Sequence, residues 1–295
     1  MPSWGGYRVR LPLTVVAARG LSRDLRAMTI EGGRGRYRVA TTMVVGASLV
    51  LLTLLGVPVL LLVVRGGAEG LTLLTRDAEL RRSLALTGFT ATAATLVTMA
   101  LGTPLAWLLA RGRMPGATVV SALLDLPLLI PHPVAGIALL LAFGRGSAAG
   151  GALEQLGLAI VGSPLGIALA MLFVSAPLYV SGAREAIARV DERYESVART
   201  LGDTPFLAAW RVTRPLAGRG LLAAAVVMWA RAVSEFGAVV ILTYNPKVVS
   251  VLSYDRFTSY GLNAVLPVAA VLVILALVPL AILRSLRGHI AFGEP

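Results

Sequence analysis

Six apolar stretches, each long enough to cross a lipid bilayer, constrain the fold of this 295-residue chain most strongly. A membrane-spanning helix needs about 20 predominantly apolar residues. Charged residues make up 14% of the chain, against about 25% in a soluble domain. Because lipid offers no partner to backbone N–H and C=O groups, each span must be helical. The sequence therefore predicts an all-α integral membrane protein with about six transmembrane helices. These helices are expected at residues 41–64, 84–110, 117–143, 164–182, 217–243 and 264–286.

Lysine and arginine are distributed unevenly among the segments that connect these stretches. If the N-terminus lies inside the cell, 19 of the 27 basic residues fall in cytoplasmic segments, seven fall outside, and Arg231 lies within a span. Cytoplasmic loops of membrane proteins carry an excess of Lys and Arg. We therefore expect a multi-pass protein of the cell membrane (plasma or inner membrane) with both termini in the cytoplasm.

The chain divides into four predicted parts. Its first 39 residues are rich in Gly and Arg without helical periodicity, so we expect a disordered basic tail that lies on anionic lipid. Met28 is an alternative start of the chain. The predicted parts are a basic cytoplasmic tail (1–39), a first transmembrane helix (40–66), a five-helix core (80–286) with a polar loop at 184–219, and a short cytoplasmic tail (287–295).

Several kinds of chemistry lack the residues that they need in this chain. There is no cysteine, which excludes disulfides, thiol catalysis and cysteine-ligated metals. The single lysine, Lys247, is not part of a Gly-rich sequence that cradles ATP phosphates, and His132 and His289 are far apart in the sequence. We therefore expect no catalytic, cofactor or metal site. An intramembrane enzyme is an alternative that no motif supports.

The polar, arginine-rich loop at 184–219 is predicted to be a helix–turn–helix elbow at the membrane face. Apolar residues at three- and four-residue spacing predict a helix over 185–203. Gly202 suits a helix end or sharp turn, where positive φ is easily tolerated. Pro215 is expected to interrupt the second helix before the fifth span. The alternative is an amphipathic linker that lies on the lipid headgroups.

The start of the second short helix of this elbow is marked by three residues. Asp203 or Thr204 can cap it, because Asp and Thr side chains accept backbone N–H groups at helix starts. Pro205 suits the first helical position.

Two charges lie inside the fifth predicted span. Arg231 and Glu235 are four residues apart and would share one helix face. Ionisable residues in a membrane usually face the bundle interior, where they pair or function. One interpretation is a structural ion pair that fixes helix packing. In the other, Arg231, Ser234 and Glu235 line or gate a pathway, in which an oxyanion would favour Arg and hydroxyl donors.

The third predicted span is rich in proline. Pro127, Pro131 and Pro133 each remove a backbone donor and disfavour regular helix before them. Broken helices within a membrane are tolerated where they face protein or a cavity. We expect a kinked span beside the pathway, or a kink that serves packing alone. His132 is expected to be a hydrogen-bonded core residue rather than a proton relay.

The elbow resembles the EAA loop of bacterial and archaeal ABC importer permeases. Glu195-x-x-Ala198-x-x-x-Gly202, with Pro215 thirteen residues later, carries this resemblance, which covers about residues 80–285. Ser196, Val197 and Arg214 depart from the common Glu, Ala and Leu. The resemblance implies a type I (MetI-like) importer permease fold, in which the elbow sits in a cleft of a separate ATPase subunit. The residues that it implies in this coupling are Glu195, Ala198, Arg199, Gly202, Asp203, Phe206 and Pro215.

Within these permeases, five segments resemble the molybdate/tungstate branch. They are residues 126–136, 231–238, 244–247, 255–262 and 266–270. Permeases for sulfate and thiosulfate share part of the pattern and are the alternative. The residues considered for the translocation pathway or gate are Pro131, Pro133, Arg231, Ser234 and Glu235.

The resemblance also implies the partners of the chain. They are two cytoplasmic ATPase subunits that bind ATP–Mg, an extracytoplasmic oxyanion-binding protein, and a second permease chain, expected to be identical. The chain itself would bind no cofactor and no nucleic acid. A secondary transporter or channel is a remote alternative, because neither needs a cytoplasmic elbow.

Overall fold

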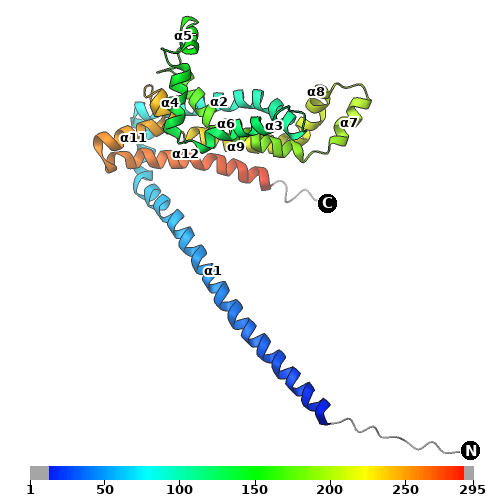
Figure 1. Ribbon diagram of the computed structural model, residues 1–295. Helices are drawn as coiled ribbons and strands as arrows, with labels where there is room; N and C mark the ends of the chain where they lie inside the picture. The colour runs from blue at the N-terminus through cyan, green and yellow to red at the C-terminus, as the bar shows by residue number, and fades with distance from the viewer. Residues whose placement is uncertain (1–12, 289–295) are drawn as a thin grey trace, which may run out of the picture. The chain divides into compact units, whose positions relative to one another are not determined.

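The computed structural model describes the backbone of residues 13–288 and the side chains of residues 41–279 and 281–285. Within residues 13–288 the regular structure is helical and contains no β-strand, which confirms the predicted all-α fold (Figure 1). Two compact units divide the chain after Leu61, and each is described by itself. The predicted tails at residues 1–12 and 289–295 lie outside the described residues.

The first unit contains most of a long helix, α1 (Leu13–Arg76). This helix begins inside the segment predicted as a disordered tail, so the structure differs from that prediction over residues 13–39. Several Ala, Leu and Arg residues in that segment are good helix formers, which favours the helix. Every side chain from Thr41 to Leu61 is exposed within the unit, as a lipid-facing helix requires.

The apolar helices confirm about six predicted spans. Five are long and apolar enough to cross a membrane, and a bent pair of helices brings the number to six. The bent pair turns by 116° at the proline-rich break, so the kink predicted for the third span is confirmed. These helices are α1 from Thr41, α2 (Ala78–Ala110), the bent pair α3 (Ala117–Leu129) and α4 (His132–Phe143), α6 (Pro164–Ala188), α9 (Arg214–Val233) and α12 (Leu262–Gly288).

Helices α2, α6 and α9 form the centre of the second unit and lie side by side (Figure 1). Glycines allow their close approach. A Cβ added at Gly220 would lie 2.4 Å from the Ala186 Cβ, and one at Gly182 would lie 2.8 Å from the Ala224 Cβ. Small residues at such crossings let helix backbones pack tightly in a membrane. The resulting core supports the elbow at one end and the broken helices at the other.

The fifth predicted span, 217–243, is not one continuous helix, which corrects that prediction. α9 ends at Val233, and the short helix α10 (Gly237–Leu242) begins after a break. Glu235 lies in this break, and its Oε1 accepts the N–H of Ala238 at 2.8 Å, which caps α10. Helix α10 packs on α4, while α5 (Ala148–Gln155) and α11 (Val249–Tyr260) complete the second unit.

Candidate functional site

Residues 189–213, called the elbow here, form the predicted helix–turn–helix between α6 and α9. They contain α7 (Glu192–Thr200), α8 (Pro205–Ala208) and a π-helix, η1 (Ala209–Thr213). Figure 1 shows α7 and α8 together at one end of the second unit. The single helix predicted over 185–203 is two helices instead, because Asp191 caps α7 by accepting the N–H of Arg193 at 2.9 Å.

The turn between α7 and α8 has the positive φ at Gly202 that the sequence predicts. Gly202 has φ +103°, a conformation that favours glycine, and a Cβ added there would meet nothing within 4 Å. Glycine is therefore required by the backbone angle and not by crowding. Thr204 is the cap of α8 and accepts the N–H of Leu207 at 3.3 Å, with Pro205 at the first position. The carboxylate of Asp203 instead pairs with Arg211 at 2.9 Å.

Pro215 was expected to interrupt the helix, and the structure shows no interruption there. η1 continues directly into α9, and Pro215 lies in the first turn of α9. The N–H of Arg214 donates to the carbonyl of Ala209, five residues earlier, in the wider π-helical pattern. This wider turn precedes a residue that has no N–H to donate. The helix therefore passes the proline without a break.

Glu195 holds the elbow to the rest of the chain, and its side-chain contacts with Arg111, Trp107 and Thr213 are called the Glu195 fastener below. Its side chain is 3% exposed, and its Oε1 lies 2.9 Å from Arg111 Nε, 3.2 Å from Trp107 Nε1 and 2.5 Å from Thr213 Oγ1, all of which donate to it. Arg111 also donates to the carbonyl of Val190 at 3.1 Å. The carboxylate predicted to lie on or near an ATPase contact is thus inside the chain, where it joins α7 to α2 and η1.

The surroundings of Glu195 hold it ionised. Burial alone would raise the pKa of its carboxyl group. Hydrogen bonds from Thr213, Arg111 and Trp107, together with the charge of Arg111, outweigh burial and lower that pKa. The fastener is therefore a charged carboxylate whose Oε1 accepts from three side chains.

The face of α7 opposite Glu195 is apolar and exposed. Tyr194 and Val197 are each 58% exposed and Leu201 is 85% exposed. These three residues are called the elbow tip below. An amphipathic helix normally buries its apolar face, whereas α7 buries its carboxylate and exposes its apolar row. Apolar residues gathered on a surface in this way mark an interaction site.

The other predicted coupling residues differ in exposure. Arg199, Gly202, Phe206 and Pro215 are exposed, and Ala198 and Asp203 are half-buried. The structure therefore places these residues in the elbow, apart from Pro215 in the first turn of α9, and it separates the buried Glu195 from the surface residues around it.

The two broken helices meet at their breaks. A Cβ added at Gly237, the first residue of α10, would lie 2.7 Å from the Cβ of His132. One added at Gly136 in α4 would lie 2.8 Å from the carbonyl oxygen of Ala238. These glycines let α4 and α10 cross in contact. The predicted pathway residues Pro131 and Pro133 flank His132 and so lie at this crossing.

The charges predicted for the pathway also lie at this crossing. Arg231 Nη2 is 2.7 Å from Glu235 Oε2, and the same nitrogen contacts His132 Nε2. Glu235 is fully buried, with its second oxygen capping α10 and its carbonyl accepting from Ser250 Oγ at 2.7 Å. Ser234 is exposed, and its hydroxyl donates to the carbonyl of Arg231 at 3.0 Å. Every one of these contacts fits the structural ion pair, and the side chain of Arg231 is 22% exposed.

The matched family covers the elbow and the crossing together. Residues 102–292 match the family described as the inner membrane component of binding-protein-dependent transport systems. The chain belongs to this family. It is therefore a multi-pass membrane component of a transport system, in agreement with its apolar helices.

Similar proteins include permeases for two kinds of oxyanion. The chain is 42% identical over 170 residues to the molybdate/tungstate transport system permease protein WtpB of Thermococcus kodakarensis, across 58% of this chain and 64% of the relative. It is 32% identical over 173 residues to the sulfate transport system permease protein CysT of Synechocystis sp., across 57% of this chain and 60% of the relative. The matches thus span less than two thirds of either relative.

Solved structures confirm the type I, MetI-like importer permease fold of this component. A chain of a bacterial ABC transporter that imports the polysaccharide alginate aligns with a TM-score of 0.65 and 15% identity, over 88% of this chain and 97% of that chain. A chain of the MetNI methionine ABC transporter aligns with a TM-score of 0.57 and 17% identity, over 70% and 95%. Identities this low show the shared fold alone.

Sequence reasoning missed the donors of the Glu195 fastener in this transport component. The sequence places Arg111 in a cytoplasmic segment at the end of a span and does not indicate that it is buried, yet its side chain is 2% exposed. Trp107 lies in the last turn of α2 and looks like an interfacial aromatic residue. No spacing links either residue to Glu195, which lies 84 residues beyond Arg111. A buried carboxylate needs a counter-charge, and that need is the signal that could have pointed to Arg111.

Proposed function

We propose that this chain is the permease subunit of an ATP-driven importer of molybdate or tungstate. The name of the relative with 42% identity supports the substrate, and the sulfate transporter relative, at 32%, gives the sulfate alternative less support. Two copies of the chain would surround one pathway, with both termini in the cytoplasm. An extracytoplasmic oxyanion-binding protein would deliver the anion.

The observation that carries the coupling role is the inverted burial of α7. Its carboxylate is fastened inside the chain while Tyr194, Val197 and Leu201 face outward. We infer that the elbow tip fits a cleft in a separate ATPase subunit, which binds ATP–Mg and performs the hydrolysis. This chain contributes no catalytic group. Arg199, Gly202 and Phe206, which are also exposed, would border that contact.

The Glu195 fastener supplies the physical link between the ATPase and the membrane. Because one carboxylate holds α7 to Arg111 on α2 and to Thr213 before α9, a displacement of the elbow must move both helices. α9 spans about 30 Å at 1.5 Å per residue. It ends beside Glu235, where α4 and α10 cross. A push on the elbow is therefore delivered to the broken helices, which we propose form the gate.

At the gate, we propose that Arg231 both stabilises the fold and attracts the transported oxyanion. Its guanidinium neutralises the buried Glu235 and leaves a partly exposed cationic edge beside Ser234. That edge would favour an oxyanion, whereas the paired carboxylate would not repel it strongly. Pro131 and Pro133 lie at the break where α3 and α4 turn by 116°.

Uptake measurements test this proposal. Cells that lack their own molybdate import are given this chain with its ATPase and binding protein, and accumulation of radiolabelled molybdate is followed. Excess unlabelled tungstate should abolish accumulation, and the same excess of sulfate should leave most of it. Strong competition by sulfate and weak competition by tungstate would replace the proposed substrate with the alternative.

A further inference from the structure

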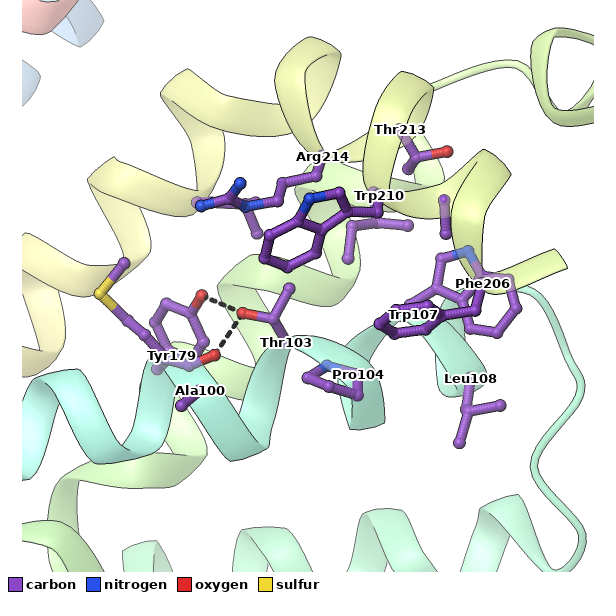
Figure 2. Close-up of a pocket in the computed structure, with 14 residues that line it drawn as sticks. Ala100, Thr103, Pro104, Trp107, Leu108, Tyr179, Phe206, Trp210, Thr213 and Arg214 are labelled. Carbon is purple, nitrogen blue, oxygen red and sulfur yellow. Dashed lines mark hydrogen bonds between the residues drawn. The ribbon is translucent and has the colours of Figure 1, made fainter. Parts of the chain in front are cut away.

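A cavity of about 520 Å³ lies at the root of the elbow, away from the crossing of the broken helices. This volume is within the range of small-molecule sites, about 300–1,000 Å³. It opens between α2, α6 and the segment from α8 to α9. Figure 2 shows residues from all of these elements around it, among them Thr103, Trp107, Tyr179, Phe206, Trp210 and Arg214.

Four of the polar groups that line this cavity are already used by the protein. The hydroxyls of Thr103 and Tyr179 bond to each other at 2.7 Å. Trp107 Nε1 and the Thr213 hydroxyl both donate to Glu195. A polar ligand would lose its water here without gaining partners, which is costly. The occupant of the interior must therefore be apolar.

Two arginines stack on tryptophans that line the cavity, and one of them, Arg214, lines the cavity itself. The guanidinium of Arg214 lies 4.0 Å from the ring centre of Trp210, and that of Arg113 lies 4.9 Å from the ring centre of Trp107. Arg211 and Arg111 are paired with carboxylates, whereas Arg113 and Arg214 have no acidic partner among the described side chains. Two unpaired guanidiniums on indole rings are available to an anion.

The cavity extends along the apolar part of α2. Met99 lines it and lies eleven residues before the end of α2 at Ala110, which is about 17 Å at 1.5 Å per residue. Phe206 and Trp210 remain 65% and 51% exposed at its mouth. Aromatic side chains with polar edges are typical of the headgroup level of a bilayer. The shape and charge thus match an amphiphile with an apolar tail and an anionic head.

We propose that this cavity binds one acyl chain of an anionic phospholipid, whose phosphate is held by Arg214 and Arg113. The proposal goes beyond oxyanion import and needs only the membrane location of the chain. The bound lipid would brace Trp107 and Thr213, the two residues that also hold Glu195. Anionic lipid would therefore stiffen the elbow from its membrane side.

Tryptophan quenching tests the lipid site. The full chain with Trp4→Phe and Trp229→Phe keeps Trp107 and Trp210 as its fluorophores. It is placed in phosphatidylcholine nanodiscs that contain brominated phosphatidylglycerol or, at equal mole fraction, brominated phosphatidylcholine. One favourable contact between an arginine and an anionic headgroup corresponds to about a fivefold preference in binding. Brominated phosphatidylglycerol should therefore quench the two tryptophans more strongly than brominated phosphatidylcholine does. Soluble glycerol phosphate should not reverse the quenching, because it has no acyl chain.

Charge variants separate this site from general attraction of anionic lipid. Arg214→Gln should remove most of the preference, and Arg113→Gln, a second variant in case the first does not fold, should reduce it. Arg219→Gln, an exposed arginine one and a half turns along α9, is the matched control and should keep the preference. Equal quenching by both lipids, full preference in the Arg214 and Arg113 variants, or equal loss in the control would each overturn the proposal. Protection of both tryptophans from either lipid would also overturn it and assign the cavity to a protein partner.

Discussion

Arg111 at the end of α2 and Glu195 on α7 are 84 residues apart in the sequence and joined in the fold, with Arg111 Nε donating to Glu195 Oε1 at 2.9 Å. Both side chains are almost completely buried. This pair fixes the elbow to the membrane core, so its removal affects structure before it affects any partner. The predictions below follow from this link and from the crossing of α4 and α10.

Glu195→Gln is expected to destabilise the protein. The amide cannot neutralise the buried guanidinium of Arg111, and breaking a buried ion pair costs about 3 kcal/mol. The midpoint of thermal unfolding of the purified permease should fall clearly. Glu192→Gln is the matched control, because Glu192 is 60% exposed and 3.8 Å from Arg111. A change in the control as large as that in Glu195→Gln would mean that the pair at Glu195 has no special role.

Acid is expected to weaken the same fastener. The pKa of Glu195 is lower in the folded protein than its ordinary value of 4.5. Its contribution to the free energy of unfolding is therefore complete above the unfolded pKa and is lost as pH falls through the folded pKa. As the pH falls below 4.5, the unfolding midpoint of the wild type should fall more than that of Glu195→Gln, whereas between pH 7 and pH 5 the difference between the two proteins should stay constant. Parallel pH profiles for the two proteins would contradict the lowered pKa.

Gly202→Val is expected to impair the elbow by backbone strain. Gly202 has φ +103° with open space around it, so the cost of valine comes from the angle, about 1–2 kcal/mol or more. Recovery of the ATPase with the permease and molybdate uptake should both fall. Gly218→Ala is a suitable control, because a Cβ there meets nothing within 4 Å and its φ is ordinary for a helix. Normal recovery and uptake in Gly202→Val would show that the turn angle is not needed.

Gly136→Leu is expected to separate α4 from α10. Its side chain would meet the carbonyl of Ala238 and the Cβ of Ile241, which lie within 3 Å of an added Cβ. Molybdate uptake should be lost while ATPase recovery, which depends on the distant elbow, stays near that of the wild type. Gly88→Leu on α2 has open space and serves as the control. If ATPase recovery were lost together with uptake, Gly136 would be needed for the stability of the whole fold and not for the crossing of α4 and α10 alone.

Arg231→Ala is expected to lower the amount of permease in the membrane. It leaves the buried Glu235 without its counter-charge, which costs several kcal/mol. Adding Glu235→Gln to this variant should restore part of the abundance, because the neutral side chain can still cap α10 by accepting from Ala238. Unchanged abundance and uptake in Arg231→Ala would show that Arg231 has neither a structural role nor a role in the pathway.

The sequence was sufficient for the features that depend on local chemistry. The apolar runs, the proline-rich kink and the turn at Gly202 each follow from a property of neighbouring residues. It failed where distant residues decide the outcome. Glu235 ends α9 because it caps α10 in the protein interior, and Glu195 turns inward because Arg111 and Thr213 converge on it from elsewhere in the chain. The π-helix before Pro215 was missed because a proline predicts a break, whereas a wider turn also accommodates it.

Co-purification of the ATPase with elbow-tip variants tests the coupling role most directly. Leu201→Glu places a charge on the most exposed residue of the elbow tip, and Leu158→Glu places one on an exposed leucine in the loop after α5, far from the elbow in the sequence. Leu201→Glu should keep its membrane abundance, lose at least about tenfold in ATPase recovery and lose molybdate uptake, since burial of a charge at an interface costs more than 1.4 kcal/mol. Leu158→Glu should recover the ATPase like the wild type. Equal recovery and equal uptake in the two variants would contradict the docking of the elbow tip in an ATPase.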